Sequence, residues 1–366
     1  MDVLLDARLG RKITGIGYYT VNLAQEFGAL APSDVRPIVR LRQRRRFRRM
    51  GLSPWSPLST SLRYSHLPAA DIIHGPNFHA PAHPTARRVA TIHDLSYLRL
   101  PECHPPGMSE RLDMLVRDSL EETALFLCDS RATYEDFVRT YDFPRERCRV
   151  VYLGVSKRFS QRLDSDTIHR VLIELGIRRR YLLHVGAMIP RKDLVTLLTS
   201  FEMVSSEHPD LDLVLVGNKT LRWASCWPDM EAWLTSRPEI AARVHVLNYV
   251  RDAWLPALYQ GATINVATPL WEGFGLTVLE AFASRTPVVT SNISSLPEIG
   301  ADIARYGVPR QPETYAEAIR EMLDPRNAED TKARVANGAA RATEFTWADT
   351  ARGTLDGYRD ACNLSI

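Results

Sequence analysis

Short runs of apolar and β-branched residues alternate with longer amphipathic runs along most of this 366-residue chain. This alternation is the pattern of βα units, in which each strand joins a parallel sheet and a helix covers it. In the first half the strand-like runs are residues 3–6, 35–40, 71–75, 88–92, 125–129 and 149–152. In the second half they are residues 181–186, 211–217, 244–247, 263–266 and 287–290. The sequence therefore predicts an α/β protein with two parallel sheets.

The amphipathic runs between these strands predict the helices and the domain limits. They cover residues 17–30, 107–123, 131–141, 194–206, 253–260, 276–283 and 312–323. Residues 156–176 lack a strand pattern, so we expect the linker there, and the length of the chain is typical of about two domains. We predict domains at residues 1–160 and 177–345, with a last helix at 346–366 whose pattern is compatible with packing on either half.

Composition excludes several classes of protein. A net charge of +3 is too small to indicate nucleic-acid binding, and 45% hydrophobic residues are ordinary for a globular chain. The five cysteines form no C-x-x-C pair, which indicates free thiols in a reducing compartment rather than disulfides or a zinc site. Because no apolar run approaches the ~20 residues that span a bilayer, we expect a cytoplasmic protein that is at most peripheral to a membrane.

The most informative segment for chemistry is a glycine-containing turn that leads into a helix and is bracketed by Glu272 and Glu280. Glycines let the backbone approach a ligand closely, and a helix start presents N–H groups and a positive dipole end to phosphate. Carboxylates are good acceptors for sugar hydroxyls. The sequence thus predicts a site for an anionic, hydroxyl-rich ligand, with backbone contacts from Gly273, Phe274, Gly275, Leu276 and Thr277.

Arg191 and Lys192 follow the strand-like run at residues 181–186, where a turn leads into a helix. A guanidinium can bind two phosphate oxygens at once and an ammonium is a compact charge, so the pair suits a diphosphate. A surface turn with solvated charges is the alternative. Near the N-terminus, Gly15 and Gly17 follow the first strand and open a helix, although they do not complete a dinucleotide-binding fingerprint.

His93 stands where a buried parallel strand ends, which is the edge at which open α/β sheets hold ligands. The alternative is a histidine that only satisfies its own hydrogen bonds. No metal is expected, because His74, His79 and His83 are irregularly spaced and the two D-x-D strings, at residues 164–166 and 210–212, are poorly placed. Cationic side chains and helix N-termini would then replace the ion.

Together these segments resemble the retaining glycosyltransferases of family 4, which have the fold called GT-B. The stretch from Glu272 to Glu280 looks like the E-x7-E motif of that family. The resemblance implies that Glu272 faces the donor sugar, that Glu280 holds the ribose, and that Arg191 and Lys192 bind the diphosphate. It also implies that Gly15 and Gly17 lie near the diphosphate, that His93 reaches the donor sugar and that the base lies near Val250.

The family implies two Rossmann-like doubly wound domains that face each other across a cleft, with the C-terminal helix crossing back to the first domain. One departure is Ala187, because many relatives have an arginine there and Arg191 would have to act alone. Residues 71–77 and 91–96 are most similar to bacterial mannosyltransferases of surface-polysaccharide assembly. We therefore expect metal-independent, retaining transfer of a mannose-like hexose from a nucleotide sugar, with GDP-mannose favoured, to a glycan or lipid-diphosphate-linked acceptor.

A cluster of arginines between Arg40 and Arg49 lies beside Trp55 and Leu58 in the expected acceptor-side domain. Such a cluster fits an anionic membrane surface or a lipid-diphosphate acceptor, whereas a solvated loop is the alternative. Two other functions stay open at this point. One is a sugar-nucleotide epimerase or phosphorylase on the same scaffold, and the other is a binding protein that has lost catalysis.

Overall fold

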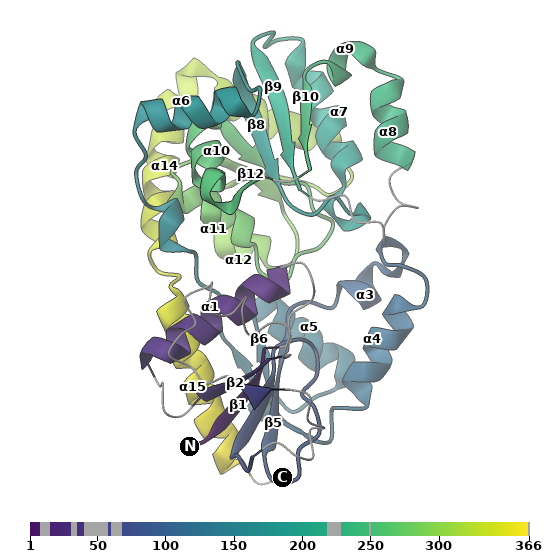
Figure 1. Cartoon of the computed structure of the whole chain (residues 1–366). Helices are drawn as coiled ribbons and strands as arrows, with labels where there is room; N and C mark the ends of the chain where they lie inside the picture. Colours follow the sequence, from purple (N-terminus) through teal and green to yellow (C-terminus); the bar gives the residue numbers. More distant parts are fainter. Residues whose placement is uncertain are drawn as a thin grey trace. The chain divides into compact units, whose positions relative to one another are not determined.

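The computed structural model describes residues 1–7, 15–30, 35–39, 58–59, 68–217, 228–248 and 250–364. The chain divides into two compact units, each built around its own parallel sheet (Figure 1). The first unit comprises Met1–Leu98, Gly107–Gly154 and Phe345–Ile366. The second comprises Arg99–Pro106 and Val155–Glu344.

The sheet of the first unit has the strand order β3-β2-β1-β4-β5-β6-β7, and all its pairings are parallel. Its strands are β1 (Val3–Asp6), β2 (Val35–Val39), β3 (Leu58–Ser59), β4 (Ile72–Gly75), β5 (Arg87–Ile92), β6 (Thr123–Cys128) and β7 (Cys148–Val150). The order runs outward in both directions from β1 and β4, as in a Rossmann fold.

Helices cover both faces of this sheet. Val116 of α4 (Met108–Arg117) and Phe137 of α5 (Arg131–Tyr141) pack in one buried cluster with Ala90, Ile92 and Phe126. On the other face α1 (Gly15–Leu30) packs against α15 (Trp347–Asn363). The C-terminal helix therefore belongs to the first unit, as the resemblance implied.

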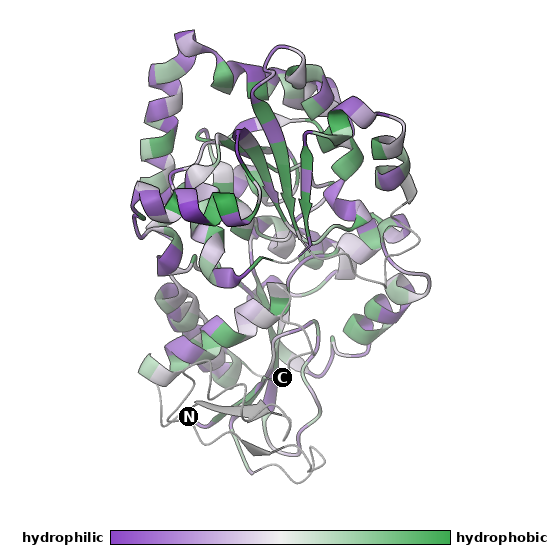
Figure 2. Ribbon diagram, turned by 45° about the horizontal axis from the view of Figure 1, so that its top comes forward, coloured by the Kyte–Doolittle hydropathy of each residue, from purple (hydrophilic) through white to green (hydrophobic). Residues whose placement is uncertain are grey.

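The sheet of the second unit has the order β10-β9-β8-β11-β12-β13 and is also entirely parallel. Its strands are β8 (Arg180–Val185), β9 (Leu211–Val216), β10 (Val244–Leu247), β11 (Ile264–Val266), β12 (Val288–Ser291) and β13 (Arg305–Gly307). Figure 2 shows its long strands as apolar along most of their length, whereas the surrounding helices carry hydrophilic residues on part of their surface. Burial of both faces explains these continuous apolar runs.

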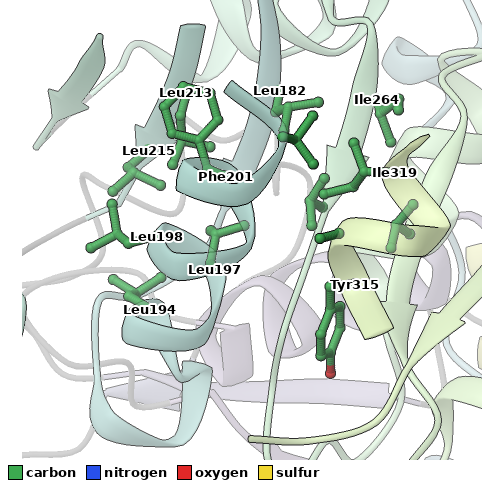
Figure 3. Packing of buried hydrophobic residues seen from close by; sticks show 14 of the residues in the cluster. Leu182, Leu194, Leu197, Leu198, Phe201, Leu213, Leu215, Ile264, Tyr315 and Ile319 are labelled. Atoms are coloured by element: carbon green, nitrogen blue, oxygen red, sulfur yellow. The ribbon is translucent and has the colours of Figure 1, made fainter. Parts of the chain in front are cut away.

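One large buried cluster of the second unit lies between this sheet and the helices that include α7 (Leu194–Ser205) and α13 (Pro312–Leu323). Leu197 and Phe201 of α7 pack on Leu213 and Leu215 of β9, and α13 adds Ile319 (Figure 3). The remaining helices of the unit are α6 (Ser165–Glu174), α8 (Pro228–Thr235), α9 (Pro238–Ala241), α10 (Leu255–Gly261), α11 (Leu276–Ala283), α12 (Leu296–Gly300) and α14 (Ala328–Ala342). The fold class is thus confirmed as α/β with two Rossmann-like units.

Two expectations from the sequence differ from the structure. The segment expected as a linker is part of the second unit, because α6 packs against α10. Asp164 caps the start of α6. The helix expected over residues 107–123 ends at Arg117, since the next residues turn into β6. The four cysteines within the described residues are free, as expected.

The part of the chain that the structure describes contains no helix long and apolar enough to cross a membrane. The arginine cluster from Arg40 to Arg49 and Trp55 lie outside the described residues. The prediction of a membrane-facing patch therefore stays a prediction.

Candidate donor-binding site

The predicted diphosphate residues lie where the strand order of the second sheet reverses. Strand β8 has β9 on one side and β11 on the other, so the loops after β8 and β11 leave the sheet in neighbouring positions. In open α/β sheets this switch point, outside the carboxyl ends of the strands, is where ligands bind. Arg191 and Lys192 lie on the first loop and Glu272 lies on the second.

The three side chains form one ion-pair cluster. Lys192 Nζ contacts Glu272 Oε1, and Arg191 Nη1 lies 3.2 Å from Glu272 Oε2. Their side chains are 13%, 15% and 16% exposed for Lys192, Arg191 and Glu272, so the charges are largely removed from water. Arg191 Nη1 also donates to the carbonyl oxygen of Trp271 at 2.5 Å. The alternative of a surface turn with solvated charges is therefore wrong for this pair.

Backbone contacts hold the two loops together. Leu270 N donates to Arg191 O at 2.8 Å, and Thr268 Oγ1 donates to Asp193 O at 2.9 Å. Asp193 in turn caps α7 by accepting from Thr196. The positions of both cations are thus set by hydrogen bonds that do not involve their side chains.

Serines after β12 fix the backbone of Glu272. Ser294 Oγ accepts from Glu272 N at 3.0 Å and donates to Glu272 O at 2.7 Å, while Ser295 Oγ donates to the same carbonyl oxygen at 3.0 Å. No sequence pattern indicated these serines, because they contact only backbone atoms of a distant segment. The backbone of Glu272 is therefore held by contacts that do not involve its carboxylate.

The helix start predicted after the glycine turn is present. Helix α11 begins at Leu276, and Gly275 precedes it with φ +116°, a conformation that other residues adopt only with strain. Gly273 and Phe274 are buried, and Thr277 lies in the first turn of the helix. The first backbone N–H groups of a helix have no partner within it, so this end of α11 suits an anion.

Glu280 lies one turn into α11 and accepts a hydrogen bond from Tyr259 Oη at 2.9 Å. Burial raises the pKa of the Glu280 carboxyl to about 7, while the bond from Tyr259 opposes the shift. Tyr259 was missed in the sequence, since it lies on α10 and only the fold brings it to this carboxylate. Glu280 is thus poised to ionise near neutral pH.

His184 lies beside this site at the end of β8. Its Nδ1 donates to Val266 O at 3.1 Å, so Nε2 is the unprotonated nitrogen. Burial and the nearby charge of Lys192 lower the pKa of His184 to about 4, and the ring is therefore neutral at physiological pH. The backbones of Gly186 and Gly217 are in close contact at this end of the sheet, because a Cβ on Gly217 would lie 1.7 Å from Gly186 O.

In the first unit His93 follows β5, as predicted, and its ring is held on both sides. Nδ1 lies 2.6 Å from Asp129 Oδ2, and Nε2 donates to Pro76 O at 2.9 Å. Burial lowers the pKa of His93, but the Asp129 carboxylate and the bond to Pro76 outweigh it and raise the pKa overall. Asp129 was missed as a partner, although it ends the next strand-like run at the same sheet edge.

A buried chain of polar groups lies near this histidine. Tyr358 Oη of α15 lies 2.7 Å from His74 Nδ1, and His74 Nε2 lies 2.8 Å from Thr91 Oγ1. Thr91 also hydrogen-bonds Tyr19, whose ring packs edge-on against His93 with centroids 5.2 Å apart. Burial lowers the pKa of His74 to about 3, so His74 acts as a neutral structural residue.

The remaining residues predicted for the site lie in helix α1 and after strand β10. Gly15 is exposed at the first position of α1, and Gly17 is buried two residues further on. Val250 is buried just after the loop that follows β10. Asp164 caps α6 and Asp212 pairs with His245 at 3.0 Å, so these D-x-D aspartates have structural partners. Among the described residues no group of three potential metal ligands was found.

Two parallel sheets in Rossmann order, with a cation pair and a helix start at a switch point, define the chain as a protein of the GT-B class. Solved structures agree at the level of the fold. The chain is similar to Anabaena HepE in complex with UDP-glucose, with a TM-score of 0.78, 16% identity, and coverage of 97% of this chain and 98% of that one. It is also similar to WaaG, a glycosyltransferase involved in lipopolysaccharide biosynthesis, with a TM-score of 0.73, 16% identity and coverage of 96% and 99%.

Family models and curated relatives give the family. The model described as Glycosyl transferases group 1 matches residues 173–341, and that described as Glycosyltransferase Family 4 matches residues 13–159. The O-antigen chain mannosyltransferase B of Escherichia coli is 30% identical over 290 residues, which cover 79% of this chain and 74% of that protein. The D-inositol 3-phosphate glycosyltransferase of Corynebacterium glutamicum is 24% identical, with coverage of 69% and 61%. The chain belongs to the family 4 glycosyltransferases and is a glycosyltransferase of the GT-B type.

Proposed function

We propose that this glycosyltransferase moves a mannose-like hexose from a nucleoside-diphosphate sugar to a hydroxyl of a glycan or lipid-linked acceptor. Such a reaction serves the assembly of bacterial surface polysaccharide or another glycoconjugate. The observation that carries the donor class is the cluster of Arg191, Lys192 and Glu272 beside the start of α11. The similarity to an O-antigen mannosyltransferase supports mannose, and GDP-mannose is the donor that we propose.

The chemistry that fits this cluster is front-face transfer with retention and without a metal. The acceptor oxygen bonds to the anomeric carbon as the bond from that carbon to the diphosphate breaks. The acceptor proton passes to the departing phosphate oxygen. Arg191, Lys192 and the N–H groups at the start of α11 stabilise the charge of the leaving group, and preorganised donors of this kind contribute about 3 kcal/mol each.

Each predicted residue has a role in this proposal. Glu272 positions the transferred sugar and Glu280 accepts from the ribose hydroxyls, while Val250 lies near the base. In this structure His93 Nε2 donates a hydrogen bond to Pro76 O. To contact the sugar, Nε2 has to give up this bond and donate to a sugar hydroxyl instead. The contact between Nδ1 and Asp129 holds the ring in place during the exchange.

Incubation with GDP-mannose, UDP-glucose, dTDP-glucose and ADP-glucose, with and without acceptor glycans, tests the proposal. We expect acceptor-dependent release of one nucleoside diphosphate and an α-linked product. Glu272→Ala should lose most transfer and still bind the nucleotide. An isomerised sugar nucleotide without acceptor would indicate an epimerase, phosphate-dependent cleavage a phosphorylase, and binding without turnover a non-catalytic protein. Unchanged turnover in Glu272→Ala would rule out its role.

A further inference from the structure

The carboxylate of Glu272 occupies both cations that the donor is expected to use. Lys192 Nζ contacts one carboxylate oxygen, and Arg191 Nη1 contacts the other at 3.2 Å. The same Nη1 donates to Trp271 O at 2.5 Å. An Nη group carries two hydrogens, and these two acceptors engage both of them.

A bound diphosphate and this carboxylate would compete for the same charges. Two anions that are close together at a site largely removed from water repel each other by several kcal/mol. The neighbouring His184 is neutral, so it adds no positive charge that could hold the second anion. Binding of a diphosphate therefore weakens the hold of Arg191 and Lys192 on the carboxylate.

The hydrogen bonds that hold the two loops are separate from those that the Glu272 carboxylate makes with the cations. The backbone of Glu272 is held on its N–H and carbonyl sides by Ser294 and Ser295. The backbones of Arg191 and Asp193 are held by Leu270 and Thr268. None of these backbone contacts has to break when the carboxylate leaves the cations.

We propose that Glu272 is a displaceable internal counterion that pairs with Arg191 and Lys192 until a diphosphate replaces it on both cations. This inference rests on the proposed function and deepens it. The displaced carboxylate becomes available to the sugar only when a diphosphate is in place. The site therefore selects for the diphosphate class of ligand, because a ligand with less charge replaces fewer of the contacts of Glu272.

A comparison of wild type with Glu272→Gln tests this inference through ligands of graded charge. Glutamine keeps the shape of the side chain and removes its charge. The wild type is first tested for binding of GDP, UDP, dTDP and ADP. The probes are then the diphosphate that binds, the monophosphate with the same base and the corresponding nucleoside. Titration calorimetry measures each affinity. Glu329→Gln is the matched control, since the Glu329 side chain is 90% exposed on α14 and pairs with Lys332.

We expect Glu272→Gln to bind the diphosphate about tenfold more tightly than wild type, because charge-assisted contacts no longer have to be broken. The monophosphate should gain less, and the affinity for the nucleoside should stay within about twofold. Glu329→Gln should leave diphosphate binding unchanged. Equal or weaker diphosphate binding by Glu272→Gln would overturn the internal-counterion role while leaving the proposed function intact.

Absence of binding by wild type to every nucleoside diphosphate would overturn the proposed function and this inference together. If Glu272→Gln fails to fold, as judged by circular dichroism, Glu272→Asp provides the second test. Aspartate keeps the charge but is one methylene shorter, so it cannot hold both cations in the same geometry. We then expect an intermediate gain in diphosphate affinity, and no gain would overturn the inference.

Discussion

Lys192 and Glu272 are 80 residues apart in the chain and form an ion pair in which both side chains are less than one-fifth exposed. The pair joins the loop after β8 to the loop after β11, at the point where the strand order reverses. A pair of this kind is sensitive to the loss of either partner, since the other is then left as an uncompensated charge.

Replacing Lys192 by methionine should weaken nucleoside-diphosphate binding by about 10- to 100-fold, because a hydrogen bond to a charged group contributes about 1.5–3 kcal/mol. Titration calorimetry measures the change. Lys332→Met is the matched control, since the Lys332 side chain is 78% exposed on α14 and should not affect binding. Equal losses in both variants would point to a nonspecific effect of charge.

Binding of the nucleoside should depend on pH through Glu280. Its carboxyl, with a pKa raised to about 7, must be ionised to accept charge-assisted bonds from ribose hydroxyls, so affinity should rise as the pH increases through 7. A nucleoside without phosphate is the probe, because phosphate groups titrate in the same range. Glu280→Gln should remove this dependence.

Tyr259→Phe gives a further test of the same carboxylate. The hydrogen bond from Tyr259 favours the ionised form of Glu280, so its loss should raise the pKa further and move the midpoint to higher pH. A midpoint that moves to lower pH would contradict the assignment of Tyr259 as the donor.

The pairing of His93 with Asp129 should appear in a titration of the histidine by NMR. We expect a pKa above the usual value of about 6.5 in wild type and a lower value in Asp129→Asn, because burial alone lowers it. The pKa of His93 is higher in the folded state than in the unfolded state, so its protonation stabilises the fold. This contribution of His93 to the free energy of unfolding is full below about pH 6.5 and is lost as the pH rises through the folded-state pKa. Urea unfolding at several pH values should show this loss in wild type and not in His93→Gln.

Gly275→Ala should destabilise the second unit by about 1–3 kcal/mol, because φ +116° is strained for any residue with a Cβ. The added Cβ would also lie 3.1 Å from Leu296 Cδ2. Gly15→Ala is the control, since an added Cβ there has no contact within 4 Å among the described residues and lies in a helix, where alanine is favoured. Urea unfolding of both variants measures the difference, and equal stabilities would rule out the strain.

Much of the fold could be predicted because the spacing of apolar residues along the chain indicates which face of each helix or strand is buried. The helices expected over residues 131–141, 276–283 and 312–323 have these bounds in the structure. The strands β3 and β13 were missed, since Leu58–Ser59 and Arg305–Gly307 contain no run of apolar or β-branched residues. Helix α6 was missed because its segment, which lacks a strand pattern, was assigned to the linker between the two sheets.

The sequence by itself determined the two parallel sheets and the residue types at their carboxyl ends. Burial patterns are local, and Arg191, Lys192, Glu272 and His93 each follow a buried strand. Only the tertiary structure decided the partners. Glu272 pairs with the two cations and is fixed by Ser294, Glu280 is held by Tyr259, and His93 is held by Asp129 and Pro76. Strand order determines which loops become neighbours, and because it relates segments far apart in the chain, no local pattern encodes these contacts.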